Sequence, residues 1–404
     1  MGTRPLAAVL SRARRNGARR RESARRGVSN AAPATAAGPG PVVFLRCSEA
    51  TAPQGHEIIS KMAAARGVAE LLGREFAGTF DASTPYSRAP YFVPDETLLL
   101  AHAHQLGIRN ERQLFGGVVP HPFVATKTIT HCLPDPDAQA QAGWQPAFGE
   151  QVRDVVLPGF SAFSRADALR AGALLLASGP VRLKRPGGVG GRGQSVVKDP
   201  PELEAELEAI DASELARDGV VLECNLVDVK TLSVGQARLG DMQISYCGTQ
   251  RLTPANNGSQ VYGGSELLVA RGDWEALLGL ELAPPTRLAI RQARTYHEAA
   301  MAVFDGMFAS RSNYDVAQGF DAAGNGRSGV LEQSWRIGGA TGAELAAIKA
   351  FQADPDLASV GACTTEIHGE SPLPPDDAVV YFRGTDARVG ALTKYARLHP
   401  HDDS

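Results

Sequence analysis

The chain contains a glycine-rich stretch from Lys184 to Val197, KRPGGVGGRGQSVV, which can adopt only a few kinds of local structure. Five of the seven residues from 187 to 193 are glycine, and glycine loses more backbone entropy on folding than any other residue. Alternating residues on either side, Val181–Lys184 and Ser195–Val197, predict two strands. The glycines therefore lie at a hairpin tip, where their backbone N–H groups can turn inward and form a nest for an anion.

Positive charge surrounds these glycines, and the first acidic residue after them is Asp199. The cations in or beside the stretch are Arg182, Lys184, Arg185, Arg192 and Lys198. A polyphosphate is the expected anion. A Walker-type loop would need Gly-Lys-Ser/Thr at a helix start, and a dinucleotide fingerprint would need G-x-G-x-x-G between a strand and a helix, so neither is predicted. A flexible surface loop remains the alternative.

A second predicted hairpin, from Tyr314 to Gln333, carries carboxylates. Side chains alternate along a strand, so Glu332 and Ser334 lie on one face, with Arg336 next on that face if the strand continues. Magnesium prefers hard oxygen ligands, commonly one or two carboxylates with water and phosphate oxygens. Asp315 and Glu332 can supply the carboxylates, and Ser334 can supply a hydroxyl oxygen.

The strand lysine and the glycine-rich hairpin resemble those of the ATP-grasp superfamily, in which they close over the nucleotide phosphates. Val220–Leu226 looks like the hinge strand that holds adenine, and Asp315 with Glu332-Gln333-Ser334-Trp335-Arg336 looks like the magnesium motif. From about Val42 onward, the chain resembles an uncharacterised bacterial family of ATP-grasp-like proteins with a domain of unknown function. The resemblance lies in the sequence motifs YFVP, FGGVVP, YGGS and EQSWRIGGA.

The resemblance implies a fold of mixed α/β and α+β class, in which two α+β lobes hold ATP behind a small leading α/β domain. A disordered basic arm is expected over residues 1–40 and the leading domain over residues 41–125. The first lobe, with the phosphate hairpin, is expected over residues 126–218. The second lobe, with the hinge and the metal motif, is expected over residues 219–404.

The resemblance also implies a set of site residues for ATP and magnesium. The nucleotide contacts are Lys127, Lys184, Gly188, Gly190, Gly191, Gly193, Glu223, Cys224 and Leu226. The metal ligands are Asp315, Glu332 and Ser334, and the catalytic residue is Arg336, which would neutralise an anionic intermediate. A surface lysine is the alternative for Lys127.

Two positions depart from the superfamily pattern. Ser334 stands where asparagine is usual, which leaves the number of metal ions open. No acid follows Leu226 at the place of the ribose ligand, for which Asp228 is the nearest candidate.

The implied reaction is ATP-dependent ligation. A small-molecule carboxylate takes the γ-phosphoryl group, and an amine or thiol acceptor then displaces phosphate from the acyl phosphate. A small-molecule kinase on the same fold and a non-catalytic nucleotide-binding module stay open as alternatives. The acceptor and the oligomeric state are not identified by any motif.

Charge and cysteine content limit the partners and the cellular compartment that the chain can have. Residues 1–40 hold nine arginines and one acid, so residues 41–404 hold 32 basic and 43 acidic residues. An acidic body argues against nucleic acid as its main partner. The five cysteines are widely spaced without a C-x-x-C pair, as expected in a reducing cytoplasm. No apolar run approaches the ~18 residues that span a membrane.

The arm over residues 1–40 has too few large apolar residues to order itself. Its arginines are also typical of a transit peptide. A start codon assigned too far upstream is the favoured explanation, because nothing in the rest of the chain requires targeting to an organelle.

Further elements follow from periodicity and caps. The leading domain should contain strands at 42–45 and 91–94 and helices at 54–72 and 95–106. Asp95 would cap the second helix, and Glu96 would lie on a solvated face.

The second lobe should contain three short strands and a loop. The strands are predicted at 232–235, 243–246 and 248–251. Residues 256–265 read as a long polar loop that could move over a substrate. Arg251 could hold an acidic group, although an ordinary ion pair in the sheet is favoured.

Overall fold

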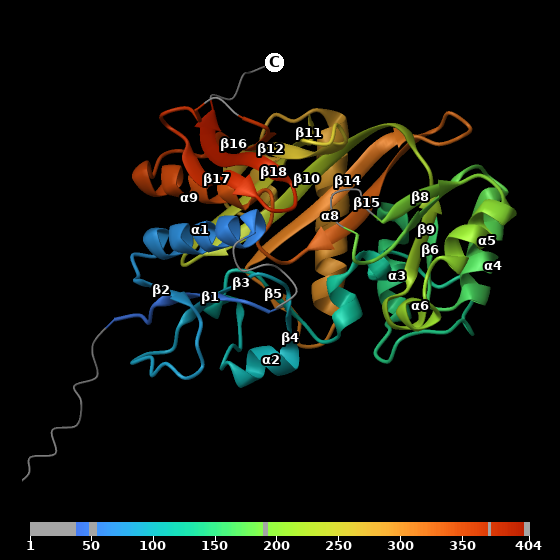
Figure 1. The fold of residues 1–404 in the computed structure, drawn as a ribbon, viewed down its shortest axis with the longest axis horizontal. Helices are drawn as coiled ribbons and strands as arrows, with labels where there is room; N and C mark the ends of the chain where they lie inside the picture. The colour runs from blue at the N-terminus through green and yellow to red at the C-terminus, as the bar shows by residue number, and fades with distance from the viewer. Residues whose placement is uncertain (1–37, 48–54, 189–192, 371–372, 400–404) are drawn as a thin grey trace, which may run out of the picture. The chain divides into compact units, whose positions relative to one another are not determined.

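The computed structural model describes residues 38–47, 55–188, 193–370 and 373–399, and residues 39–404 form one compact unit (Figure 1). All but the last three residues of the predicted arm lie outside the described ranges. Within those ranges, no helix is long and apolar enough to cross a membrane.

The N-terminal part of this unit is a small α/β layer. Its three parallel strands, in the order β2-β1-β3, are β1 (Val42–Leu45), β2 (Phe76–Thr79) and β3 (Tyr91–Pro94). Helix α1 (His56–Leu71) follows β1, as predicted. Every residue of β1 is buried, as its uninterrupted apolar run requires for a strand covered on both faces.

The second predicted helix of this layer is wrong in its start. Helix α2 (Leu100–Gln105) begins five residues after Asp95, and residues 98–99 form the short strand β4 (Leu98–Leu99). The Asp95 side chain is buried and accepts the Cys47 backbone N–H at 2.7 Å, so it anchors a loop instead of capping a helix. β4 joins a small sheet with β5 (Gly117–Val119) and β13 (Phe308–Ala309).

The glycine-rich hairpin belongs to an antiparallel four-stranded sheet in the order β6-β9-β7-β8. Its strands are β6 (Gly159–Ala162), β7 (Val181–Lys184), β8 (Gln194–Val197) and β9 (Val220–Cys224). Its helices are α4 (Arg165–Leu176), α5 (Pro200–Glu208) and α6 (Ala212–Asp218). Ser164 caps α4 and Asp199 caps α5, because each side chain accepts a hydrogen bond from a backbone N–H of the first turn.

The largest sheet has eight strands in the order β15-β14-β10-β11-β12-β16-β18-β17, all antiparallel (Figure 1). They are β10 (Val227–Leu239), β11 (Met242–Pro254), β12 (Gln260–Arg271), β14 (Arg311–Phe320), β15 (Gly326–Ser334), β16 (Ser359–His368), β17 (Val379–Asp386) and β18 (Gly390–His399).

Two predictions for this sheet are wrong. The segments 243–246 and 248–251 form one strand, β11, because the ladder continues through Gly248. Glycine fits this position in the sheet, since a Cβ there would meet the Glu266 carbonyl oxygen at 1.8 Å. The predicted loop at 256–265 is mostly strand β12, and only a short turn precedes Gln260. Ladder pairing with β11 outweighs the polar, glycine-rich composition of this stretch.

Helices cover both faces of the large sheet (Figure 1). Helix α8 (Pro284–Val303) packs on one face, with Leu232 and Val234 of β10 in its apolar cluster. Helices α1 and α9 (Thr341–Ala353) pack on the other face, with Ala237 and Leu239 in theirs. This even and odd division of β10 follows from the alternation of side chains along a strand.

Short elements connect the sheets. They are the 3-10 helices η1 (Glu111–Gln113), η2 (Pro122–Ala125), η3 (Lys127–Thr130) and η4 (Arg153–Val155), and the helices α3 (Pro146–Val152) and α7 (Trp274–Leu278).

Candidate functional site

The predicted metal hairpin forms and brings its carboxylates together. In the β14–β15 ladder, Asp315 pairs with Glu332 and Asn313 pairs with Ser334, so each pair lies side by side on one face. Asp315 accepts hydrogen bonds from Gln250 Nε2 at 2.9 Å and Asn313 Nδ2 at 3.0 Å. Burial and the adjacent Glu332 carboxylate raise the pKa of Asp315 to about 6.

This carboxylate pair suits a divalent cation. Like charges directly opposite one another in a sheet destabilise it, and a cation between Asp315 and Glu332 would relieve that repulsion. Within the described ranges, no group of three or more histidine, cysteine and acidic side chains forms a metal site. The remaining ligands would therefore come from water, phosphate oxygens or the Ser334 hydroxyl, which is the coordination that magnesium accepts.

Lys127 connects this pair to the glycine-rich hairpin. Its ammonium lies 2.5 Å from Glu332 Oε2 and donates to the Gly188 carbonyl oxygen at 2.9 Å. The side chain is 4% exposed, so the alternative of a surface lysine is wrong. One lysine thus contacts both the predicted metal hairpin and the predicted phosphate hairpin.

The glycine-rich hairpin closes as predicted. Lys184 pairs with Gln194, and the Arg185 backbone N–H donates to the Gly193 carbonyl oxygen at 2.9 Å. Gly193 has a φ of +70°, which favours glycine. Gly190 and Gly191 lie outside the described residues, so the anion nest itself stays a prediction.

Two of the hairpin's arginines are hydrogen-bonded to protein groups. Arg182 donates to Gln194 and Asn225, and Arg185 donates to the Ala209 carbonyl oxygen. They brace the hairpin against neighbouring segments.

Lys184 is held by a buried carboxylate that the sequence analysis assigned to the hinge. Its ammonium lies 2.5 Å from Glu223 Oε1, and His131 Nε2 lies 3.4 Å from Glu223 Oε2. Burial would raise the pKa of Glu223, but Lys184 and His131 outweigh it and lower the pKa to about 2. Glu223 therefore positions Lys184, and its carboxylate is already engaged by these two partners.

The other hinge residues lie close by. Cys224 ends β9 and donates its backbone N–H to the Pro158 carbonyl oxygen at 2.9 Å. Leu226 is buried in a small cluster with Leu157 and Ala317 of β14. The hinge thus packs against the metal hairpin, while its contact with adenine remains a prediction.

Arg336 faces the leading α/β layer. Its Nε lies 2.9 Å from Glu96 Oε2, and Lys61 of α1 lies 3.2 Å from Glu96 Oε1. The prediction that Glu96 lies on a solvated face is therefore incomplete, because this carboxylate is shared by two cations. Arg251 pairs with Glu266 at 3.2 Å, which agrees with the favoured ion pair.

A buried polar network supports the strand that carries these residues. Arg311 donates to both oxygens of Glu344 and to the carbonyl oxygens of Ser334 and Arg336. Tyr246 donates to Glu344 Oε1 at 2.7 Å and lies 3.0 Å from Asn313 Oδ1. The carbonyls beside the predicted ligands are therefore fixed by an ion pair that the sequence analysis missed.

The contacts of His131 with Glu223 and of Arg311 with Glu344 could not be recognised from local sequence patterns. His131 precedes Glu223 by 92 residues, and Arg311 precedes Glu344 by 33 residues. Neither pair has the fixed short spacing by which helical or strand neighbours are recognised.

Comparison with known proteins agrees with this geometry at the level of fold. The family described as Protein of unknown function (DUF3182) matches residues 44–396. No curated protein matches the sequence. A pyruvate carboxylase from Rhizobium etli is similar in structure, with a TM-score of 0.50 and 12% identity over 90% of this chain and 36% of that chain. The chain has the ATP-grasp fold, which confirms the prediction.

Two more solved structures are similar at lower scores. Phosphoribosylamine–glycine ligase from Thermotoga maritima has a TM-score of 0.49 and 14% identity over 89% of this chain and 92% of that chain. N5-carboxyaminoimidazole synthetase from Staphylococcus aureus, complexed with ADP, has a TM-score of 0.47 and 12% identity over 90% of this chain and 94% of that chain.

Proposed function

This chain belongs to the family described as Protein of unknown function (DUF3182), and from its ATP-grasp fold we propose that it is an ATP-dependent ligase. It binds MgATP and joins a small-molecule carboxylate to an amine or thiol. The observation that carries this proposal is the double contact of Lys127 with Gly188 and Glu332, because it joins a phosphate hairpin to a carboxylate pair. We expect the reaction in the cytoplasm, where the five free cysteines stay reduced.

Nucleotide binding uses the glycine-rich hairpin and two lysines. Lys127 and Lys184 contribute charge-assisted contacts to the phosphates, and the hairpin contributes backbone N–H groups. Glu223 keeps the Lys184 ammonium in place, so the charge is preorganised before ATP arrives. Cys224 and Leu226 lie where the adenine would be held.

Asp315, Glu332 and Ser334 would hold magnesium. A bound magnesium ion neutralises charge on phosphate oxygens during phosphoryl transfer. Arg311 and Asn313 keep the strand and the Asp315 carboxylate in position through the hydrogen bonds described above.

The acceptor side is formed by Arg336 and Lys61. These cations already hold one carboxylate, that of Glu96, with one oxygen each. Glu96 is 47% exposed, and an exposed ion pair contributes only about 0–1 kcal/mol, so a substrate carboxylate can replace it at small cost. We therefore assign Arg336 to charge neutralisation on the substrate carboxylate and the acyl phosphate that follows.

The proposed reaction balances in two steps. A carboxylate oxygen attacks the γ-phosphorus, the bond from phosphorus to the β,γ-bridging oxygen breaks, and ADP leaves. The amine nitrogen or thiol sulfur then attacks the acyl carbon, inorganic phosphate leaves, and the nucleophile loses its proton to solvent. Catalysis here depends on positioning and electrostatic stabilisation more than on covalent chemistry by the protein.

Hydroxylamine trapping tests the reaction class. The full chain is incubated with MgATP, pools of carboxylates and hydroxylamine, and hydroxamate, ADP and phosphate are measured. The proposal expects all three. ADP with a stable phosphorylated product and no free phosphate identifies a kinase, and neither product in the presence of tight ATP binding identifies a binding module.

Glu332→Gln tests the site itself. We expect turnover to be lost while ATP binding weakens only partly, because Lys127, Lys184 and the hairpin still hold phosphate. Isothermal titration with and without magnesium separates the two effects. Glu298→Gln is the matched control, since this exposed, ion-paired carboxylate lies on α8, against the opposite face of the sheet. Unchanged magnesium dependence in Glu332→Gln contradicts the assigned metal site.

A further inference from the structure

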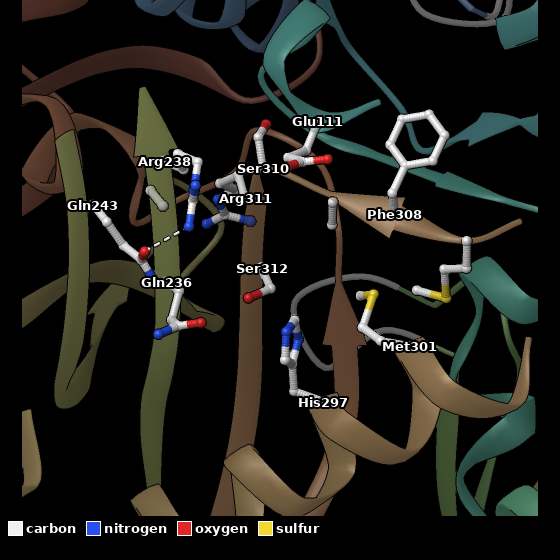
Figure 2. Close-up of a pocket in the computed structure, with 13 residues that line it drawn as sticks. Glu111, Gln236, Arg238, Gln243, His297, Met301, Phe308, Ser310, Arg311 and Ser312 are labelled. Atoms are coloured by element: carbon white, nitrogen blue, oxygen red, sulfur yellow. Dashed lines mark hydrogen bonds between the residues drawn. The ribbon is translucent and has the colours of Figure 1, made fainter. Parts of the chain in front are cut away.

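A cavity of about 280 Å³ lies on the other face of the large sheet (Figure 2). It is lined by Arg238 of β10, Ser312 of β14 and His297 and Met301 of α8. Ser312 and Tyr314 alternate with Asn313 and Asp315 along β14, so this cavity and the carboxylate pair occupy opposite faces. It is therefore separate from the site proposed for ATP.

Charges of both signs line this cavity. Arg238 donates through Nη2 to Gln243 Oε1 at 2.7 Å, which is a neutral partner. Glu111 of η1 lines the cavity as well. Among the ion pairs of the described ranges, none includes Arg238 or Glu111. Charged side chains that line a cavity without an ion-pair partner are suited to form charge-assisted hydrogen bonds with a ligand of opposite charge.

The cavity also has an apolar side. Figure 2 shows Phe308 and Met301 on the side away from Arg238 and Gln243. Methionine is flexible and polarizable, so it adapts to ligand side chains of different shape. The volume is near the lower limit of small-molecule pockets, roughly 300 Å³, so the ligand must be small.

His297 adds a neutral imidazole ring. Its Nδ1 lies 2.7 Å from the Tyr314 hydroxyl, which also accepts a hydrogen bond from Trp335 Nε1 at 3.1 Å. Burial lowers the pKa of His297 to about 4, which keeps the ring neutral. Figure 2 shows this ring pointing into the cavity.

We propose that this cavity binds a small zwitterion, an α-amino acid with an apolar side chain. Arg238 pairs with its carboxylate, Glu111 pairs with its ammonium group, and Met301 and Phe308 contact its side chain. The assignment is independent of the proposed ligase reaction. Trp335, which lies between Ser334 and Arg336, is connected to the cavity lining through its hydrogen bond to Tyr314, whose hydroxyl contacts His297.

Isothermal titration of the full chain without nucleotide tests the assignment. The probes are leucine and methionine, their amides, and the matching acids without the amino group. We expect the amino acids to bind and each altered probe to bind at least about tenfold more weakly, because each lacks one charge-assisted contact. Equal binding of the acid without the amino group overturns the zwitterion, and no binding of leucine or methionine overturns the site.

Variants locate the binding. Arg238→Met and Glu111→Gln should each weaken amino-acid binding at least about tenfold. Arg112→Met is the matched control, because Arg112 is a neighbouring residue of η1 with an exposed side chain outside the cavity lining, and its affinity should not change. Glu111→Gln changes neither size nor packing, so it keeps the test valid if Arg238→Met does not fold.

Arg336→Met separates this cavity from the proposed acceptor site. An amino acid that binds in the cavity is retained by Arg336→Met and lost from Arg238→Met. The reverse pattern means that the amino acid occupies the acceptor site, and it overturns the cavity assignment.

Discussion

Two glutamates in this protein are each shared by two basic side chains, yet they differ in burial. Glu223 lies between Lys184 and His131, and all three side chains are at most 4% exposed. Glu96 lies between Lys61 and Arg336, and its side chain is 47% exposed. The distances are similar, from 2.5 to 3.4 Å in the first group and from 2.9 to 3.2 Å in the second.

Burial therefore decides what each group can do. Removing Glu223 leaves the buried Lys184 ammonium without its counter-charge, and an uncompensated buried charge costs several kcal/mol. Lys61 and Arg336 can exchange Glu96 for water or for another anion, because all three side chains keep access to solvent. The first group is suited to hold Lys184 fixed, and the second is suited to be opened by a substrate.

The largest expected effect is on the stability of Glu223→Gln. The amide keeps the shape but leaves Lys184 without a counter-charge, so we expect a loss of about 3–5 kcal/mol in the free energy of unfolding. Urea unfolding followed by circular dichroism measures it. Lys184→Met combined with Glu223→Gln should recover part of the loss, because the pair is then removed together. A loss below 1 kcal/mol in the single variant would remove the contrast between the two glutamates.

The stability of the protein in acid should also depend on Glu223. The pKa of Glu223 is about 2 in the folded protein and roughly 4.3 in an unfolded chain, so the folded state favours the ionised form. Its contribution, about 3 kcal/mol, is present above pH ~4.3 and is lost as the pH falls through the folded pKa. Urea midpoints between pH 6 and 3 should therefore fall more steeply for the wild type than for Glu223→Gln. Parallel slopes would mean that Glu223 does not titrate with a lowered pKa.

Lys127→Met should affect ligand binding more than folding. Its partner Glu332 is 35% exposed and can be hydrated when the lysine is removed, unlike Glu223. We expect the affinity for an ATP analogue to fall at least about tenfold, because a charge-assisted phosphate contact is lost. Fluorescence titration measures the affinity and thermal unfolding checks the fold. Full affinity in a folded variant would exclude Lys127 from the phosphate site.

The sequence was sufficient where chemistry is local. The glycine hairpin and the strands of Asp315 and Glu332 were predicted, because strand alternation depends on residues near one another. The Glu223–His131 contact was not predicted, since it forms only when η3 packs beside β9.

Glycine was the other source of error. Gly248 breaks the sequence pattern of a strand, yet pairing with β10 and β12 on both sides keeps β11 continuous. Tertiary pairing thus outweighs a local preference that reads as a turn.

Glu96→Gln should have the smallest effect on stability and the most specific effect on catalysis. An exposed pair contributes about 0–1 kcal/mol, so the free energy of unfolding should change by no more than that. Glu96 also competes with the substrate carboxylate for Arg336 and Lys61, and glutamine carries no charge with which to compete. The KM for the carboxylate should therefore fall in Glu96→Gln, while Arg336→Met should raise it and lower kcat. Steady-state kinetics with the substrate found by hydroxylamine trapping measures both constants. A higher KM in Glu96→Gln would instead mean that Glu96 holds the two cations in place, as Glu223 does for Lys184, and the contrast between the two glutamates would then lie in their exposure alone.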